Sequence, residues 1–174
     1  MVKPGDIEAA IRNVPDFPKA GIQFKDITPV LADARLFAGT IDLLTKDFKP
    51  GSVDAVVGID ARGFIFAAAA AVKLGAGFVP VRKKGKLPFK TYEQDHALEY
   101  GSATVAMHVD ALKPGARVLL VDDLLATGGT AAAATALVKK LKAQIVEVSF
   151  LIELKYLNGR EKLKDYPVRS IVVY

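Results

Sequence analysis

Two adjacent carboxylates followed by a glycine-rich loop form the most distinctive chemical pattern of this 174-residue sequence. Residues 118–130 read VLLVDDLLATGGT. The apolar run 118–121 predicts a buried parallel strand that ends where Asp122 and Asp123 begin, and a short link leads to the loop Ala126, Thr127, Gly128, Gly129 and Thr130. The alanine-rich segment that follows predicts a helix. Free N–H groups and the positive end of its dipole favour a phosphate at the loop.

The two acids indicate what else the pocket holds. A carboxylate accepts hydrogen bonds from vicinal sugar hydroxyls, and a nearby magnesium ion can offset the remaining negative charge. Together the acids and the loop predict a pocket for a ribose 5-phosphate. The alternative is an ordinary strand–loop–helix turn with two solvated acids. Other phosphate signatures fit less well, because the sequence lacks G-x-x-x-x-G-K-[ST] and Gly75-Ala76-Gly77 lacks a third glycine.

A second polar turn follows another apolar strand. The predicted strand 53–59 runs into Asp60-Ala61-Arg62 and then into an alanine-rich helix. Ligands of open parallel sheets bind outside the carboxyl ends of the strands. We therefore expect Asp60 and Arg62 to share a pocket with Asp122 and Thr127. The alternative is a surface salt bridge between Asp60 and Arg62.

A long basic segment follows the third predicted strand, 77–82. Its polar, basic character and its length favour a functional lid over a passive link. The stretch 88–97 shows no clear pattern, and His96 within it is interpreted as a loop residue and not as a catalyst.

The remaining periodicities predict the elements that position these residues. The fold class is α/β, with a mainly parallel, twisted sheet and helices on both faces. Asp6 is the expected N-cap of a helix over 6–13, and Asn158 that of a short helix over 159–164. Prolines and a glycine predict an irregular arm over 14–33. Further elements are a helix over 33–48 and strands over 102–108, 144–151 and 168–174.

Composition restricts the class of protein. A hydrophobic content of 51% and a charged content of 25% are typical of a globular domain. No apolar run approaches a membrane span, and the first residues do not form a signal peptide. Without cysteine, disulfides are excluded and a cytoplasmic location is the simplest expectation. The net charge is +5, and much of the basic charge lies in residues 82–86, which favours a local polyanion over a broad nucleic-acid surface. A solvated basic loop is the alternative. We expect no nucleic-acid or membrane partner.

Four motifs resemble one family. VLLVDDLLATGGT resembles the phosphoribosyl pyrophosphate (PRPP) motif of type I phosphoribosyltransferases, and LLATGGT resembles the form found in members that act on adenine. GIDARGF resembles the family's GIDSRGF, and RKKGKLP and LEYG resemble the ends of its flexible catalytic loop. PDFPxxGIxFxDITP resembles its N-terminal hood. The resemblance covers nearly the whole chain.

The resemblance implies roles for individual residues. Asp122 and Asp123 hold ribose hydroxyls, and the 126–130 loop holds the 5-phosphate. The pyrophosphate ligands are Arg62, Arg82, Lys83 and Lys86, and Asp60 acts through metal-bound water. Glu99, beside Tyr100 in the lid, exchanges a proton with the purine. Ile22, Phe24 and Lys25 close over the base, although the family commonly has arginine at the Lys25 position.

The activity implied is magnesium-dependent transfer of the phosphoribosyl group from PRPP to N9 of adenine, in a homodimer. Transfer to another purine and a PRPP-sensing regulator without catalysis are the alternatives. We expect residues 1–174 to form one domain, with a hood over about 1–34, a core over about 35–174 and a lid over about 82–101.

Overall fold

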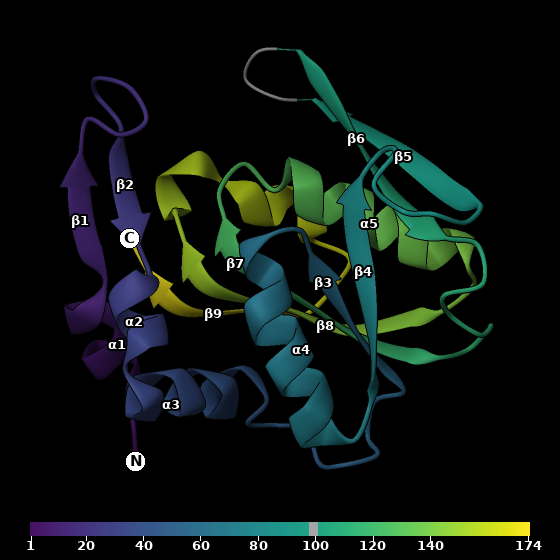
Figure 1. The fold of residues 1–174 in the computed structure, drawn as a ribbon, viewed down its shortest axis with the longest axis horizontal. Coiled ribbons are helices and arrows are strands. Elements are labelled where there is room, and N and C mark those ends of the chain that lie inside the picture. The colour runs from purple at the N-terminus through teal and green to yellow at the C-terminus, as the bar shows by residue number, and fades with distance from the viewer. Residues whose placement is uncertain (98–100) are drawn as a thin grey trace.

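The computed structural model describes residues 1–97 and 101–174. The chain forms a large mixed sheet, helices on both of its faces and a small N-terminal sheet (Figure 1). The strands are β1 Arg12–Pro15, β2 Gln23–Asp26, β3 Ala55–Ile59, β4 Gly77–Lys83, β5 Thr91–Ala97, β6 Ser102–His108, β7 Arg117–Leu125, β8 Gln144–Glu153 and β9 Val168–Val173. The helices are α1 Pro4–Ala10, α2 Thr28–Ala32, α3 Ala34–Leu44, α4 Arg62–Leu74 and α5 Gly129–Lys140, with 3₁₀ turns η1 Lys155–Leu157 and η2 Gly159–Leu163.

The seven-stranded sheet confirms the predicted fold class. Its strand order is β5-β6-β4-β3-β7-β8-β9, with parallel pairing from β4 to β9 and antiparallel pairing of β5, β6 and β4. Figure 1 shows α4 in front of this sheet and α5 behind β4. Among the described residues, no helix is long and apolar enough to cross a membrane.

Alternating residues of the central strands build two separate cores. Val57 of β3 and Leu120 of β7 pack with Leu137 of α5, whereas Val56 and Leu119 face α3 and α4 on the other side. These side chains are fully buried. Each contributes about 1.5–3 kcal/mol by leaving water. The double-sided burial holds the ends of β3 and β7 rigidly beside each other.

Strand β7 is longer than predicted. The acids were expected to end it, but β7 continues through Asp122 and Asp123 to Leu125. The reason is its partner, because Leu124 and Leu125 remain in register with Ile152 and Glu153 of β8. The acids therefore project from a strand and not from a flexible turn.

The N-terminal arm is also more regular than predicted. Strands β1 and β2 form an antiparallel hairpin that pairs Val14 with Phe24, and α2 follows. The prolines lie where they do not interrupt hydrogen bonding: Pro15 ends β1, and Pro29 is in the first turn of α2. The prediction of an irregular arm was therefore wrong, since these prolines mark the limits of elements.

Of the two predicted N-caps, Asp6 was wrong, whereas Asn158 is the N-cap residue of η2 as predicted, although without a side-chain capping bond. Lys3 caps α1, and the Asp6 carboxylate accepts a hydrogen bond from the Lys3 backbone N–H at 2.8 Å. Asn158 adopts the left-handed conformation between η1 and η2, and its side chain makes no capping bond. Asp6 and Asn158 both lie at helix ends. The position of a short polar residue in the sequence does not show which backbone group, if any, its side chain will bond.

The patternless stretch before the lid's end forms a strand. β5 pairs with β6 along its whole length, from Thr91 opposite His108 to Ala97 opposite Ser102. Helix α5 supports it, because Lys140 Nζ donates to the Glu93 carbonyl at 2.6 Å. His96 therefore lies in a strand and not in a loop. The strand predicted for 102–108 is confirmed.

Candidate active site

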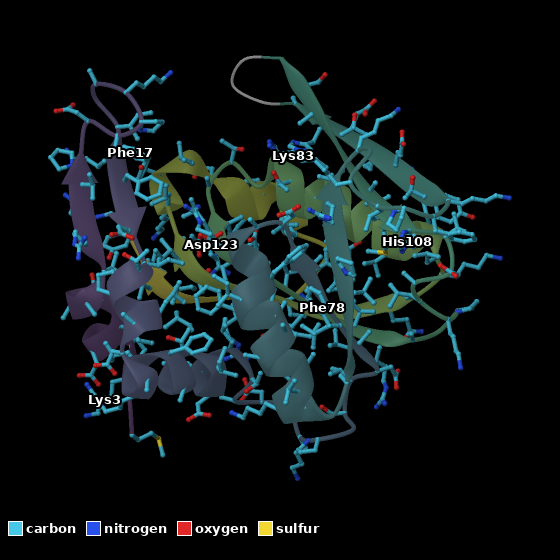
Figure 2. The ribbon with its side chains drawn as sticks, viewed as in Figure 1. Lys3, Phe17, Phe78, Lys83, His108 and Asp123 are labelled. Atoms are coloured by element: carbon cyan, nitrogen blue, oxygen red, sulfur yellow. The ribbon has the colours of Figure 1, made fainter. Side chains whose placement is uncertain are left out.

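The carboxyl ends of β3 and β7 open into one cavity of about 460 Å³. Asp60 and Arg62 line it from the β3 side, and Asp122, Asp123 and Thr127 line it from the β7 side. The predicted shared pocket is thus confirmed. Figure 2 shows Asp123 near the upper end of α4, with Lys83 on the side of the β5–β6 hairpin.

The glycine-rich loop surrounds the N-terminus of α5. All five predicted loop residues line the cavity, and α5 begins at Gly129. Gly128 has a φ of +78°, and a Cβ there would overlap the Gly159 carbonyl oxygen. Only glycine fits this position. The twelve-residue α5 directs its free N–H groups and positive dipole end into the cavity, where a phosphate is favoured.

The adjacent acids have different environments. Asp123 is only 7% exposed, and its Oδ2 lies 2.6 Å from Arg62 Nε. Asp122 Oδ1 accepts the Asp123 backbone N–H at 2.9 Å. Burial, followed by the negative charge of Asp123, raises the pKa of Asp122 well above its ordinary value. The site therefore holds one ion-paired acid and one that is costly to ionise.

Gly63 brings the two strand ends close together. Arg62 is the first residue of α4, and a Cβ on the next residue would lie 2.5 Å from Asp122 Oδ1. The close approach is possible only because residue 63 has no side chain. No role had been predicted for Gly63, although its place beside Arg62 in GIDARGF was the available signal.

Asp60 and Arg62 do not pair with each other, so the alternative of a salt bridge between them was wrong. Arg62 pairs with Asp123 and packs 5.3 Å from the centre of the Phe24 ring. Asp60 Oδ2 accepts a hydrogen bond from Arg82 Nε at 2.9 Å. Each arginine therefore bridges two different strand ends.

The basic segment begins inside the sheet. Arg82 and Lys83 are the last residues of β4, and both line a second cavity of about 210 Å³ with Asp60 and Thr130. Arg82 Nη1 also donates to the Lys86 carbonyl at 3.0 Å, which folds the RKKGK turn back on itself. The second cavity shares Asp60 and Thr130 with the first.

The hood residues gather near Arg62 and the C-terminus. Phe24 packs edge-on against Phe17 at 5.1 Å, and the Ile22 carbonyl accepts the Phe17 N–H at 3.3 Å. Lys25 Nζ lies 3.7 Å from the centre of the Tyr174 ring, a cation–π contact. The Lys25 side chain is thus held by the C-terminal residue, and Phe24 is the hood side chain that contacts a cavity residue.

A glycine–arginine pair after β8 supports the phosphate loop. A Cβ at Gly159 would overlap the Ala126 carbonyl oxygen, and the next residue, Arg160, binds the buried Glu153 carboxylate at 2.7–2.9 Å. This contact lowers the pKa of Glu153. No local sequence pattern predicted a role for Gly159 and Arg160, because η2 is distant from the phosphate loop along the chain.

Glu99 and Tyr100, the predicted lid residues, lie outside the described residues.

Comparison with known proteins agrees with this geometry. Residues 23–172 match the model of the phosphoribosyl transferase domain. The chain therefore belongs to the phosphoribosyl transferase family.

Individual relatives show which members of the family this chain resembles. The chain is 59% identical to the adenine phosphoribosyltransferase of Acidothermus cellulolyticus, over 97% of this chain and 96% of that protein. The crystal structure of the Rhodothermus marinus adenine phosphoribosyltransferase has 49% identity and a TM-score of 0.93, with 98% of each chain covered. The Saccharomyces cerevisiae enzyme, complexed with adenine and an imino-altritol bisphosphate, has 40% identity and a TM-score of 0.91, with 97% of each chain covered.

Proposed function

We propose that this protein transfers the phosphoribosyl group of PRPP to N9 of adenine and releases AMP and pyrophosphate, a purine salvage reaction. The observation that carries the proposal is the single cavity in which paired acids, a phosphate loop and an arginine meet. The full-length similarity to adenine phosphoribosyltransferases supports adenine as the acceptor.

The proposed chemistry needs positioning and charge stabilisation. The bond between ribose C1 and the pyrophosphate oxygen breaks, its electron pair leaves with pyrophosphate, and adenine N9 forms a new bond to C1. Arg62 and Arg82 stabilise the charge that develops on the leaving group, assisted by Lys83 and Lys86. The Glu99 carboxylate accepts the N9 proton. The protein otherwise holds the reactants in line and excludes water.

The donor side of the cavity suits a sugar phosphate. The 126–130 loop binds the 5-phosphate through N–H groups, and Asp122 and Asp123 accept hydrogen bonds from the ribose hydroxyls. Asp123 is already ion-paired with Arg62. PRPP therefore exchanges one set of charged contacts for another when it binds.

We also propose that magnesium binds with PRPP. Within residues 1–97 and 101–174, no three acidic or histidine side chains cluster as metal ligands, so the substrate's own phosphate oxygens are the main ligands. Asp60 fits a contact through water, because its carboxylate is 21% exposed in the cavity and Arg82 bonds only one oxygen in the described contacts. The ion supplies neutralisation of the pyrophosphate charge.

A homodimer is the proposed assembly. Ile65 and Val72, two turns apart on α4, and Phe78 of β4 are 40%, 84% and 37% exposed, and such exposed apolar side chains suit burial against a second copy of the chain. Sedimentation velocity tests this, with Val72→Glu expected to shift a dimer to a monomer. A monomeric wild-type protein would contradict it.

The cytoplasmic location stays a prediction, consistent with the cysteine-free sequence.

The test of the activity is a coupled assay for pyrophosphate release with PRPP and Mg²⁺, supplying adenine, guanine, hypoxanthine and xanthine one at a time. Release with adenine alone supports the proposal. Release with another base keeps the PRPP site but reassigns the acceptor. Tight PRPP binding without release for any base would make a PRPP-sensing regulator the better interpretation.

A further inference from the structure

One histidine nitrogen beside the phosphate loop lacks a hydrogen-bond partner. His96 is in β5, and its Nδ1 atom is buried without a partner; within the described parts of the chain, only Ser52 Oγ shares this property. A buried polar atom without a partner costs free energy, and almost all such atoms are satisfied in the functional state. The Nδ1 atom therefore indicates a partner that is absent from the protein alone.

The surroundings of Nδ1 define the chemistry of that partner. His96 lines the 210 Å³ cavity together with Arg82, Lys83 and Thr130. Its Nδ1 lies 3.5 Å from where a Cβ of Gly129 would be, at the N-terminus of α5, and Lys162 Nζ lies 3.9 Å from the same point. Two cations line the same cavity, and the positive end of α5 lies beside this nitrogen, so the environment favours an anionic acceptor and disfavours another cation.

The acids near His96 do not bond to its Nδ1 atom. Asp60, the acidic residue lining this cavity, accepts a hydrogen bond from Arg82, and the neighbouring Asp95 accepts one from the Thr104 hydroxyl at 2.5 Å. The acceptor is therefore expected to come from the ligand. A phosphoryl oxygen meets both requirements, since it is anionic and accepts hydrogen bonds.

We propose that His96 is a further substrate-binding residue that donates a hydrogen bond from Nδ1 to a phosphoryl oxygen. This inference rests on the proposed function. The oxygen belongs either to the 5-phosphate, held by the loop that includes Thr130, or to the pyrophosphate, expected beside Arg82 and Lys83. His96 is thus a direct ligand contributed by the hairpin that leads into the lid.

The hydrogen bond also has a consequence for the lid. The Ala97 carbonyl oxygen lies 3.3 Å from the Cβ position of Gly129, so the backbone next to His96 already packs against the phosphate helix. In the sequence, Glu99 follows Ala97 by two residues. A bond from His96 to bound substrate would therefore add a ligand contact to β5 where this strand already packs on α5.

The experiment compares ligand affinities of four variants by isothermal titration calorimetry. AMP reports the 5-phosphate alone, magnesium pyrophosphate reports the other site alone, and PRPP reports both. His96→Ala removes the donor, His96→Asn retains an N–H near the Nδ1 position, and His96→Gln moves it toward the Nε2 position. His108→Ala is the matched control, because His108 is the chain's other histidine and lies at the opposite end of the same hairpin (Figure 2).

We expect His96→Ala to weaken PRPP binding about tenfold, together with either AMP or pyrophosphate but not both. His96→Asn should recover most of the affinity, whereas His96→Gln should not. Equal affinities for all three ligands in wild type and His96→Ala would overturn the proposal, as would a similar loss in His108→Ala. If His96→Ala fails to fold, the difference between the Asn and Gln variants decides the question.

The two proposals fail in distinguishable ways. A wild-type protein that binds AMP and pyrophosphate but releases no pyrophosphate with any base would refute the transferase activity, while the His96 affinities would still be measurable. An active wild type with unchanged His96 variants would refute only the role of His96.

Discussion

Arg62 Nε lies 2.6 Å from Asp123 Oδ2, so the cation predicted for pyrophosphate is ion-paired with the acid predicted for ribose. Asp123 is 7% exposed, and its charge is balanced mainly by this arginine. A substrate that brings hydroxyls to Asp123 and phosphates to Arg62 replaces the pair on both sides at once. Within the protein, the charges of these two residues therefore balance each other.

Asp123→Asn is expected to weaken the use of PRPP without weakening the binding of pyrophosphate. The KM for PRPP should rise about tenfold, because a hydrogen bond to a charged acceptor becomes a weaker neutral one. Pyrophosphate affinity should stay the same or increase, since Arg62 is released from its pair. Steady-state kinetics and calorimetry measure these quantities. Equal losses for PRPP and pyrophosphate would show that the acid only maintains the pocket's shape.

Asp122→Asn is expected to stabilise the protein while impairing catalysis. The raised pKa means that ionising Asp122 costs more in the folded state than in the unfolded state. The stabilising effect of protonation is complete below the ordinary pKa and is lost as pH rises through the folded value. The variant's advantage should therefore grow as pH rises from about 4 towards neutral.

Urea unfolding measures this advantage, which we expect to reach about 1 kcal/mol, or ~2–4 °C in Tm. The matched control is Asp110→Asn, which removes an exposed carboxylate and should leave the unfolding curve unchanged. A destabilised Asp122→Asn variant at neutral pH would contradict the assigned cause of the pKa shift.

Arg160→Ala is expected to weaken phosphate binding indirectly, through the loss of support for the phosphate loop. Its guanidinium binds the buried Glu153 and the Val168 carbonyl, which fixes Gly159 beneath the phosphate loop. Removing it should cost about 2 kcal/mol of stability, between the values for exposed and buried ion pairs. AMP affinity should fall while pyrophosphate affinity is retained.

The control for Arg160→Ala is Arg117→Ala, which breaks the half-exposed pair with Asp54 at the opposite end of the sheet. That variant should keep its AMP affinity.

The contribution of Glu153 to stability depends on pH in the opposite direction from that of Asp122. The lowered pKa of Glu153 makes its contribution present above the ordinary value and lost as pH falls through the folded value. Arg160→Ala should therefore destabilise most at neutral pH.

Glu99→Gln is expected to lower turnover by about 10²–10⁴-fold, the range of general acid–base catalysis, with PRPP affinity nearly unchanged. Single-turnover assays with adenine and equilibrium binding of PRPP separate the two effects. A parallel loss of binding and turnover would assign a structural part to this residue instead.

The local motifs of this sequence determined the family, the fold class and the shared cavity. An apolar run next to two acids and a glycine-rich loop indicates a strand, cavity-lining residues and a helix start within thirteen residues, and each of these inferences depends only on neighbours in the chain. The same holds for β3, Asp60 and Arg62. Short-range chemistry of this kind can be interpreted before any tertiary contact is known.

Only the tertiary structure decided which charges pair and what supports the loop. Arg62 meets Asp123 because β3 and β7 are neighbours, and Gly159 meets Gly128 because β8 ends beside β7. β5 was not predicted because its own residues carry little pattern, and pairing with β6 and packing on α5 stabilise it. These contacts join segments that are distant along the chain. Their free energies depend on strand order and register, which local sequence does not encode.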